Sequence, residues 1–179
     1  MRVLIAGILG GIAMYVWASV AHLSPLGAIG AHTMPNERLV VAALQLSLGD
    51  KGGVYVYPGP SGGGAAAKPP APTAEGMLAY TPNGAGALTP RQLGTEFALE
   101  MIEALLMAAI AALAAVDFGR RVAIATLVGL IAGMATNVSY WNWYGFGLDY
   151  TLANAFIELM KFVVAGLVIA AMLRAKKIA

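Results

Sequence analysis

The chain contains no cysteine, two histidines and few charged residues, which make up 11% of its 179 positions. The absence of cysteine excludes disulfides, thiolate metal sites and a cysteine nucleophile. The 11 lysines and arginines and 9 aspartates and glutamates leave a net charge of +2, and no basic block could neutralise a phosphate backbone. We therefore expect no nucleic-acid partner.

Motifs that mark catalytic or cofactor sites are also missing. The sequence has no HExxH motif and no pair of ExxH motifs, and the lysine of "GPSGGGAAAKPP" is followed by prolines, unlike that of a phosphate-binding loop. We expect no cofactor, no catalytic residues and no enzymatic activity. A metal site built from His22, His32 and Glu96, with Glu100 nearby, is the weakest alternative, because their spacing matches no established ligand pattern.

The sequence does contain a large excess of apolar residues. A hydrophobic content of 59% and a mean hydropathy of +0.74 exceed what a soluble domain of this length could bury. Four stretches are long enough to cross a hydrocarbon core of about 30 Å. They are Val3–Ala21, Phe97–Val116, Val122–Tyr140 and Leu152–Leu173. The sequence therefore predicts an all-α membrane protein, a bundle of four transmembrane helices in contact with the lipid bilayer.

Basic residues predict the orientation of these spans, because cytoplasmic loops carry an excess of lysine and arginine. One set of span ends carries Arg2, Arg120, Arg121, Arg174, Lys176 and Lys177. We therefore expect both termini in the cytoplasm. The resulting division is a first span at 1–21, an extracytoplasmic loop at 22–90, three further spans at 91–174 and a cytoplasmic tail at 175–179. A cleaved signal peptide is the alternative for the first span, but its length, Tyr15 and Trp17 favour an anchor.

The loop between the first two spans is too long for a simple connection. The stretch "MPNERLVVAALQLSLGD" begins with a proline suited to a first helical turn and predicts a short amphipathic helix. The stretches "GGVYVYPGP" and "GMLAYTPNG" predict a small β-hairpin, and "SGGGAAAKPPAPTAEG" between them predicts no regular element.

Aromatic and small residues are expected to anchor and pack the spans. The predicted interfacial aromatic belt consists of Tyr15, Trp17, Tyr140, Trp141, Trp143, Tyr144 and Phe146. Two GxxxG motifs, Gly7/Gly11 and Gly129/Gly133, would permit close helix contacts, although glycine is also tolerated in membrane helices without marking an interface.

A set of polar residues falls within the predicted spans: Glu100, Glu103, Asn137, Asn154, Glu158 and Lys161. An ionisable group in hydrocarbon costs about 2.5–3.5 kcal/mol on insertion scales, so these side chains should face the bundle interior. Lys161 lies near the middle of its span, and Glu158, three residues earlier, and Glu103 could both pair with it. The sequence therefore predicts one buried polar network.

This network has two main interpretations. In the first, it is structural, and it sets the helix register or receives a basic residue of a partner. In the second, a proton or cation moves through Glu100, Glu103, Glu158 and Lys161, although the cytoplasmic half of the bundle offers no matching polar residues. Glu96 and Glu100 can also be explained by the interface and the positive end of a helix dipole, whereas Glu103 lies too deep for that.

The stretches "MPNERLVVAALQLSLGDKGGVYVYPGP" and "NVSYWNWYGFGLDYTLAN" resemble a group of small bacterial inner-membrane proteins of unassigned function. The resemblance implies four spans in a bacterial cytoplasmic membrane, and it implies no activity. The small-residue helix faces and the long outer loop could dock other subunits, so the sequence predicts a non-catalytic accessory subunit of a larger membrane complex, with respiratory or photosynthetic electron transfer as one setting. A small proton- or cation-coupled transporter is the alternative.

Overall fold

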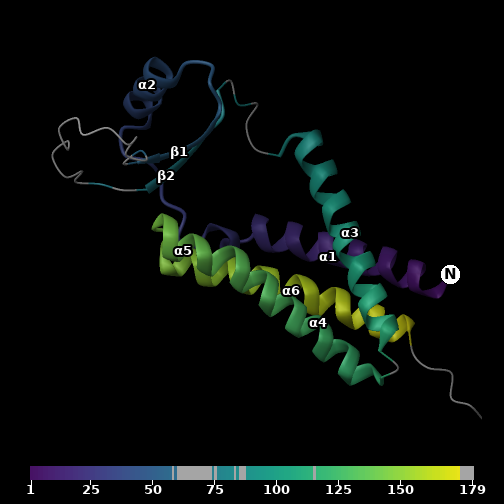
Figure 1. Cartoon of the computed structure of the whole chain (residues 1–179). Coiled ribbons are helices and arrows are strands. Elements are labelled where there is room, and N and C mark those ends of the chain that lie inside the picture. Colours follow the sequence, from purple (N-terminus) through teal and green to yellow (C-terminus); the bar gives the residue numbers. More distant parts are fainter. Residues whose placement is uncertain are drawn as a thin grey trace, which may run out of the picture.

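A computed structural model describes residues 1–57, 59, 74, 76–82, 84, 88–114 and 116–173 (Figure 1). Most of the predicted irregular segment "SGGGAAAKPPAPTAEG" lies outside these residues, as does the predicted basic tail with Arg174, Lys176 and Lys177. The described part of the chain is mostly helical and includes a small two-stranded sheet.

Four long helical stretches dominate the structure. They are α1 (Arg2–Leu23), α3 (Pro90–Leu113), α4 (Phe118–Gly133), which continues through a π-helical turn (Met134–Val138) into α5 (Ser139–Tyr144), and α6 (Leu148–Met172). Among the described residues, three helices are long and apolar enough to cross a membrane: α1, the continuous helix over 118–144, and α6. Three of the four predicted spans are therefore confirmed by length and composition. α3 is not among them, because Glu96, Glu100 and Glu103 interrupt its apolar stretch.

The helices form an open bundle rather than a closed one. In Figure 1, α1, α6 and α4 run beside one another, whereas α3 crosses α1 obliquely and its first half projects away from the others. The carboxyl ends of α3 and α6 and the start of α4 lie at the end of the bundle where α1 begins, here called the basic end. The opposite end carries α2 and the strands, and is here called the loop end.

The α1/α3 crossing depends on the first GxxxG motif. A Cβ atom on Gly7 would lie 2.7 Å from Leu105 Cδ2 and 3.0 Å from Leu105 Cα, and one on Gly11 would lie 3.0 Å from Met101 Cα. Such distances leave no room for a side chain, so glycine allows the two backbones to approach closely.

The second GxxxG motif has the same role between α4 and α6. A Cβ on Gly129 would lie 3.0 Å from the carbonyl oxygen of Leu159, and one on Gly133 would lie 3.1 Å from that of Ala155. Both motifs therefore mark helix interfaces, and not merely positions that tolerate glycine. Small residues and methionines fill the core between the helices.

α3 begins at Pro90, seven positions before the predicted start at Phe97. Thr89 forms a capping box: its Oγ1 accepts a hydrogen bond from the Gln92 backbone N–H, and the Gln92 side chain accepts one from the Thr89 backbone N–H. The stretch "TPRQ" carries this signal, because a threonine, a proline at the first helical position and a glutamine favour a helix start.

The polypeptide between α1 and α3 forms the predicted helix and hairpin. α2 spans Glu37–Leu48, and Asn36, in the left-handed conformation, precedes it, so Pro35 lies outside the helix rather than in its first turn. β1 (Gly53–Tyr57) pairs antiparallel with β2 (Gly76–Tyr80). The Tyr80 hydroxyl donates to the carbonyl oxygen of Gly49 at 3.1 Å, which connects the hairpin to the end of α2.

Candidate functional site

The crossing of α3 and α6 brings four ionisable side chains together, here called the ion cluster: Glu100, Glu103, Glu158 and Lys161. The Lys161 Nζ lies 3.2 Å from Glu100 Oε1, 3.2 Å from Glu103 Oε2 and 3.2 Å from Glu158 Oε2. At Glu100 and Glu103 these contacts are ion pairs rather than aligned hydrogen bonds. The cluster lies near the middle of α6, so one ammonium serves carboxylates from two helices in what should be a hydrocarbon environment.

Burial differs sharply among the three carboxylates. The Glu100 side chain is 1% exposed, whereas those of Glu103 and Glu158 are 38% and 25% exposed. The explanation of Glu100 by the interface and a helix N-terminus is therefore wrong, because Glu100 is the most buried member of the cluster. Glu103 and Glu158 instead remain partly exposed at the surface of the described part of the chain.

The charges of the ion cluster do not balance. Three carboxyl groups surround a single ammonium in the described part of the chain, so one cation does not neutralise them when all three are ionised. In addition, Glu100 Oε2 is buried and has no hydrogen-bond partner among the described residues. An unsatisfied buried acceptor is costly, and a charged one more so. Among the described residues, the cluster therefore has fewer cations than carboxyl groups and contains one buried oxygen without a hydrogen-bond partner.

The two asparagines of the predicted network bond elsewhere. The Asn137 side chain donates to the carbonyl oxygen of Gly133 at 3.1 Å, and that of Asn154 donates to the carbonyl oxygen of Tyr150 at 2.9 Å. Each side-chain amide thus donates to a backbone carbonyl oxygen four residues earlier in its own helix. The structure accordingly assembles four of the six predicted residues into one cluster, and it leaves the two amides as local backbone partners.

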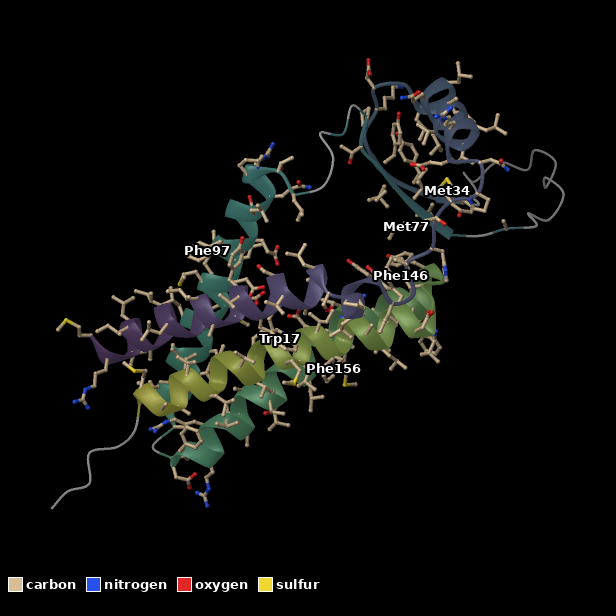
Figure 2. The ribbon with its side chains drawn as sticks, turned by 180° about the vertical axis from the view of Figure 1, so that it is seen from behind. Trp17, Met34, Met77, Phe97, Phe146 and Phe156 are labelled. Atoms are coloured by element: carbon tan, nitrogen blue, oxygen red, sulfur yellow. The ribbon has the colours of Figure 1, made fainter. Side chains whose placement is uncertain are left out.

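The predicted aromatic belt divides into two groups. Trp17 is partly buried, and its Nε1 donates to the carbonyl oxygen of Ile157 at 3.1 Å, so it joins α1 to α6 (Figure 2). Tyr15 contacts Phe97 of α3 edge to face at 5.2 Å. At the loop end, Tyr140 contacts both Tyr144 and Phe146, and Phe146 contacts Tyr150, with the rings tilted or edge to face. Trp141 and Trp143 are exposed.

Arg121 has a structural role that the sequence did not predict. Its Nε donates to the carbonyl oxygen of Ala111 at 3.3 Å and its Nη1 to that of Leu173 at 2.8 Å. These carbonyl groups lie at the carboxyl ends of α3 and α6. The last carbonyl groups of a helix have no hydrogen-bond partner within the helix, and they carry partial negative charge. The sequence pattern treated Arg121 only as a marker of membrane side.

The weak metal-site candidates do not form a site in the described residues. His22 and Glu96 line a groove of about 620 Å³ between the diverging loop-end halves of α1 and α3, and His32 is exposed in the loop. No group of three or more histidine, aspartate or glutamate side chains in the described ranges could hold a metal ion.

Within the described residues, the first half of α3 is exposed along most of its surface. Every residue from Pro90 through Leu99 is exposed, and burial begins only at Glu100. Phe97, at 41% exposure, marks this diverging half in Figure 2. In contrast, the second half of α3 contributes Ala104, Met107, Ala108 and Ala111 to the core.

Comparison of the chain with protein-family models, curated proteins and solved structures finds no match. The interpretation of the ion cluster therefore depends on its own geometry.

Proposed function

We propose that this chain is a non-catalytic accessory subunit of a larger membrane complex. The observation that supports this is the ion cluster: a buried ammonium near the middle of a long apolar helix, surrounded by three carboxyl groups, two of which are partly exposed. Ionisable groups at such depth are normally paired or face a protein interior. A neighbouring subunit would provide that interior.

The proposal includes α3 as a fourth span, with the basic end in the cytoplasm. Its second half packs against α1 through Gly7 and Gly11, and its carboxyl end contacts Arg121 at the basic end. Two of the glutamates that interrupt its apolar stretch, Glu100 and Glu103, pair with Lys161. Lys161 lies in α6, which is long and apolar enough to cross a membrane. Pairing lowers the cost of placing those carboxylates in the membrane.

The test is the size of the assembly that contains the chain. The full chain, tagged and isolated from its native membrane in a mild detergent, should migrate well above the mass of one copy. Leu106→Trp, on the exposed face of α3, should release the chain, whereas Leu127→Trp on α4 is the matched control, since the two leucines are 61% and 58% exposed. A wild-type chain that migrates alone would overturn the proposal.

One observation favours the alternative, a small proton- or cation-coupled transporter. Glu100 Oε2 is a buried acceptor without a described partner, which a transported proton or cation could satisfy. Against this, α1, α3 and α6 are apolar from the cluster to the region of Arg121 at the basic end. A route along these three helices therefore lacks polar groups in one half of the bundle.

Flux measurements test the alternative directly. Purified chain in liposomes with a trapped pH-sensitive dye, under an imposed potential, should show no proton flux above that of protein-free liposomes if the subunit proposal is right. A flux that Glu100→Gln abolishes, with Glu37→Gln in the loop as control, would support transport and contradict a purely structural cluster.

A further inference from the structure

Two glutamates and two leucines outline an uncovered surface on the membrane-embedded part of the chain. Leu99, Glu103 and Leu106 share one face of α3, because spacings of four and three positions lie on one side of a helix. Leu99 and Leu106 are 49% and 61% exposed, and Glu103 lies between them. Glu158 of α6 lies beside Glu103 around the same ammonium. We refer to these four residues as the acidic face.

The charge of the acidic face selects among possible occupants. The cluster has more carboxyl groups than Lys161 alone can neutralise. Glu100 Oε2 is also buried and has no hydrogen-bond partner among the described residues, so a further positive charge would stabilise the cluster. A second copy of this chain would present the same excess of carboxylates, so pairing two acidic faces would bring like charges together in hydrocarbon. The complementary occupant carries positive charge.

The depth of the acidic face determines the kind of occupant. Glu103 and Glu158 lie near the middle of the bundle, close to Lys161 in the 25-residue helix α6. At that depth, a peptide backbone must satisfy its own hydrogen bonds, which a helix does. The exposed leucines on either side of Glu103 offer an apolar seam for such a helix.

We propose that the acidic face binds a transmembrane helix of another protein, and that this helix carries an arginine or lysine near its midpoint. This inference rests on the proposed subunit function and specifies its partner. The partner's cation would lie against Glu103 and Glu158 and share them with Lys161, which would leave Glu100 mainly to Lys161. Pairing would thereby lower the free-energy cost of placing the charges of both proteins in the membrane.

A designed peptide tests the site without knowledge of the natural partner. Two peptides of about 20 leucines, with lysine-flanked ends, would carry either arginine or leucine at the midpoint. Binding of each labelled peptide to the labelled full chain would be followed by fluorescence energy transfer in phosphatidylcholine vesicles. The arginine peptide should bind wild-type chain about tenfold more tightly than the leucine peptide.

Variants identify the residues responsible for this preference. Glu103→Gln/Glu158→Gln should remove it, since the remaining Glu100 and Lys161 balance each other. Glu37→Gln in α2 removes a carboxylate far from the cluster and should leave the preference intact. Thermal unfolding checks the double variant, and if it does not fold, Glu103→Gln alone should reduce the preference. Equal binding of both peptides to wild type, or a preference that survives loss of Glu103 and Glu158, would overturn the inference.

Self-association serves as the competing outcome. If labelled copies of the chain associate with one another and the arginine peptide does not displace them, a second copy covers the acidic face and the inference is wrong. The peptide measurement concerns only the site, whereas the assembly size measured from native membranes concerns only the subunit role. The two proposals can therefore fail separately.

Discussion

Lys161 of α6 and Glu100 of α3 form an ion pair with 3.2 Å between Nζ and Oε1, and their side chains are 9% and 1% exposed. They lie 61 positions apart in sequence, and the pair joins a helix with strong membrane-spanning character to one whose apolar stretch is interrupted. Because both groups are buried, neither can turn to water if the other is lost. The pair thus makes the position of α3 depend on α6.

Replacing Lys161 with methionine should strongly destabilise the bundle. The change leaves three carboxylates without their ammonium, and breaking a buried ion pair from one side costs about 3–5 kcal/mol. Unfolding in mixed micelles with increasing SDS would measure the loss. The double change Lys161→Met/Glu100→Gln should lose less than Lys161→Met alone, because it removes a buried charge. Equal losses would contradict the relief expected from removing that buried charge.

Gly7→Ala and Gly94→Ala should have opposite effects, although both are glycines in long helices. A methyl group on Gly7 would meet Leu105 at 2.7 Å, and overpacking of this kind costs about 1–3 kcal/mol. Gly94 has nothing within 4 Å of its added Cβ, so alanine there should stabilise α3 by about 0.5–1 kcal/mol. The same SDS titration compares them, and a destabilising Gly94→Ala would argue that something covers that half of α3.

Arg121→Met should loosen the basic end of the bundle. It removes hydrogen bonds to the carbonyl oxygens of Ala111 and Leu173, and a bond from a charged donor contributes about 1.5–3 kcal/mol. Hydrogen exchange of the last turns of α3 and α6 should accelerate. Arg120→Met is the matched control, since its side chain is 75% exposed and pairs only at 3.7 Å with Asp117. Similar exchange in the two variants would contradict the role assigned to Arg121.

Acidification should weaken the start of α4 through Asp117, which caps that helix. The Arg120 backbone N–H donates to Asp117 Oδ1 at 2.9 Å and holds the pKa of the carboxyl below its usual value of 3.8. A lowered pKa in the folded state means that the stabilisation is present above the unfolded value and disappears as pH falls through the folded value. Exchange protection of the Arg120 amide should therefore decline as the medium is acidified below about pH 4.

Asp117→Asn is the control for this pH dependence. Asparagine retains a side-chain oxygen that can accept the same hydrogen bond, and it does not titrate. Protection of the Arg120 amide in this variant should change little over the same range of pH. A decline as steep as that of the wild type would place the titrating group elsewhere.

The candidate site was partly predictable because the spacing of Glu158 and Lys161 along one helix already makes them neighbours. The alignment of α3 against α6 was not predictable, since it depends on how closely α1 allows α3 to approach. That approach at Gly7 and Gly11 places Glu100 inward, although its distance from the helix start had suggested an interface. Trp17 and Arg121 escaped prediction for a similar reason, because their partners are backbone carbonyls of helices distant in sequence.

The sequence alone determined the apolar helices, the hairpin and the short loop helix, because these depend on local properties: run length, period, turn residues and capping. Only the tertiary structure decided which charges meet, which glycines lie at interfaces, and which half of α3 is exposed among the described residues. Such features depend on distances between helices far apart in sequence, where one buried ammonium must serve carboxylates from two helices. The excess of carboxyl groups over ammonium within the described cluster is the observation on which the proposed partner helix depends.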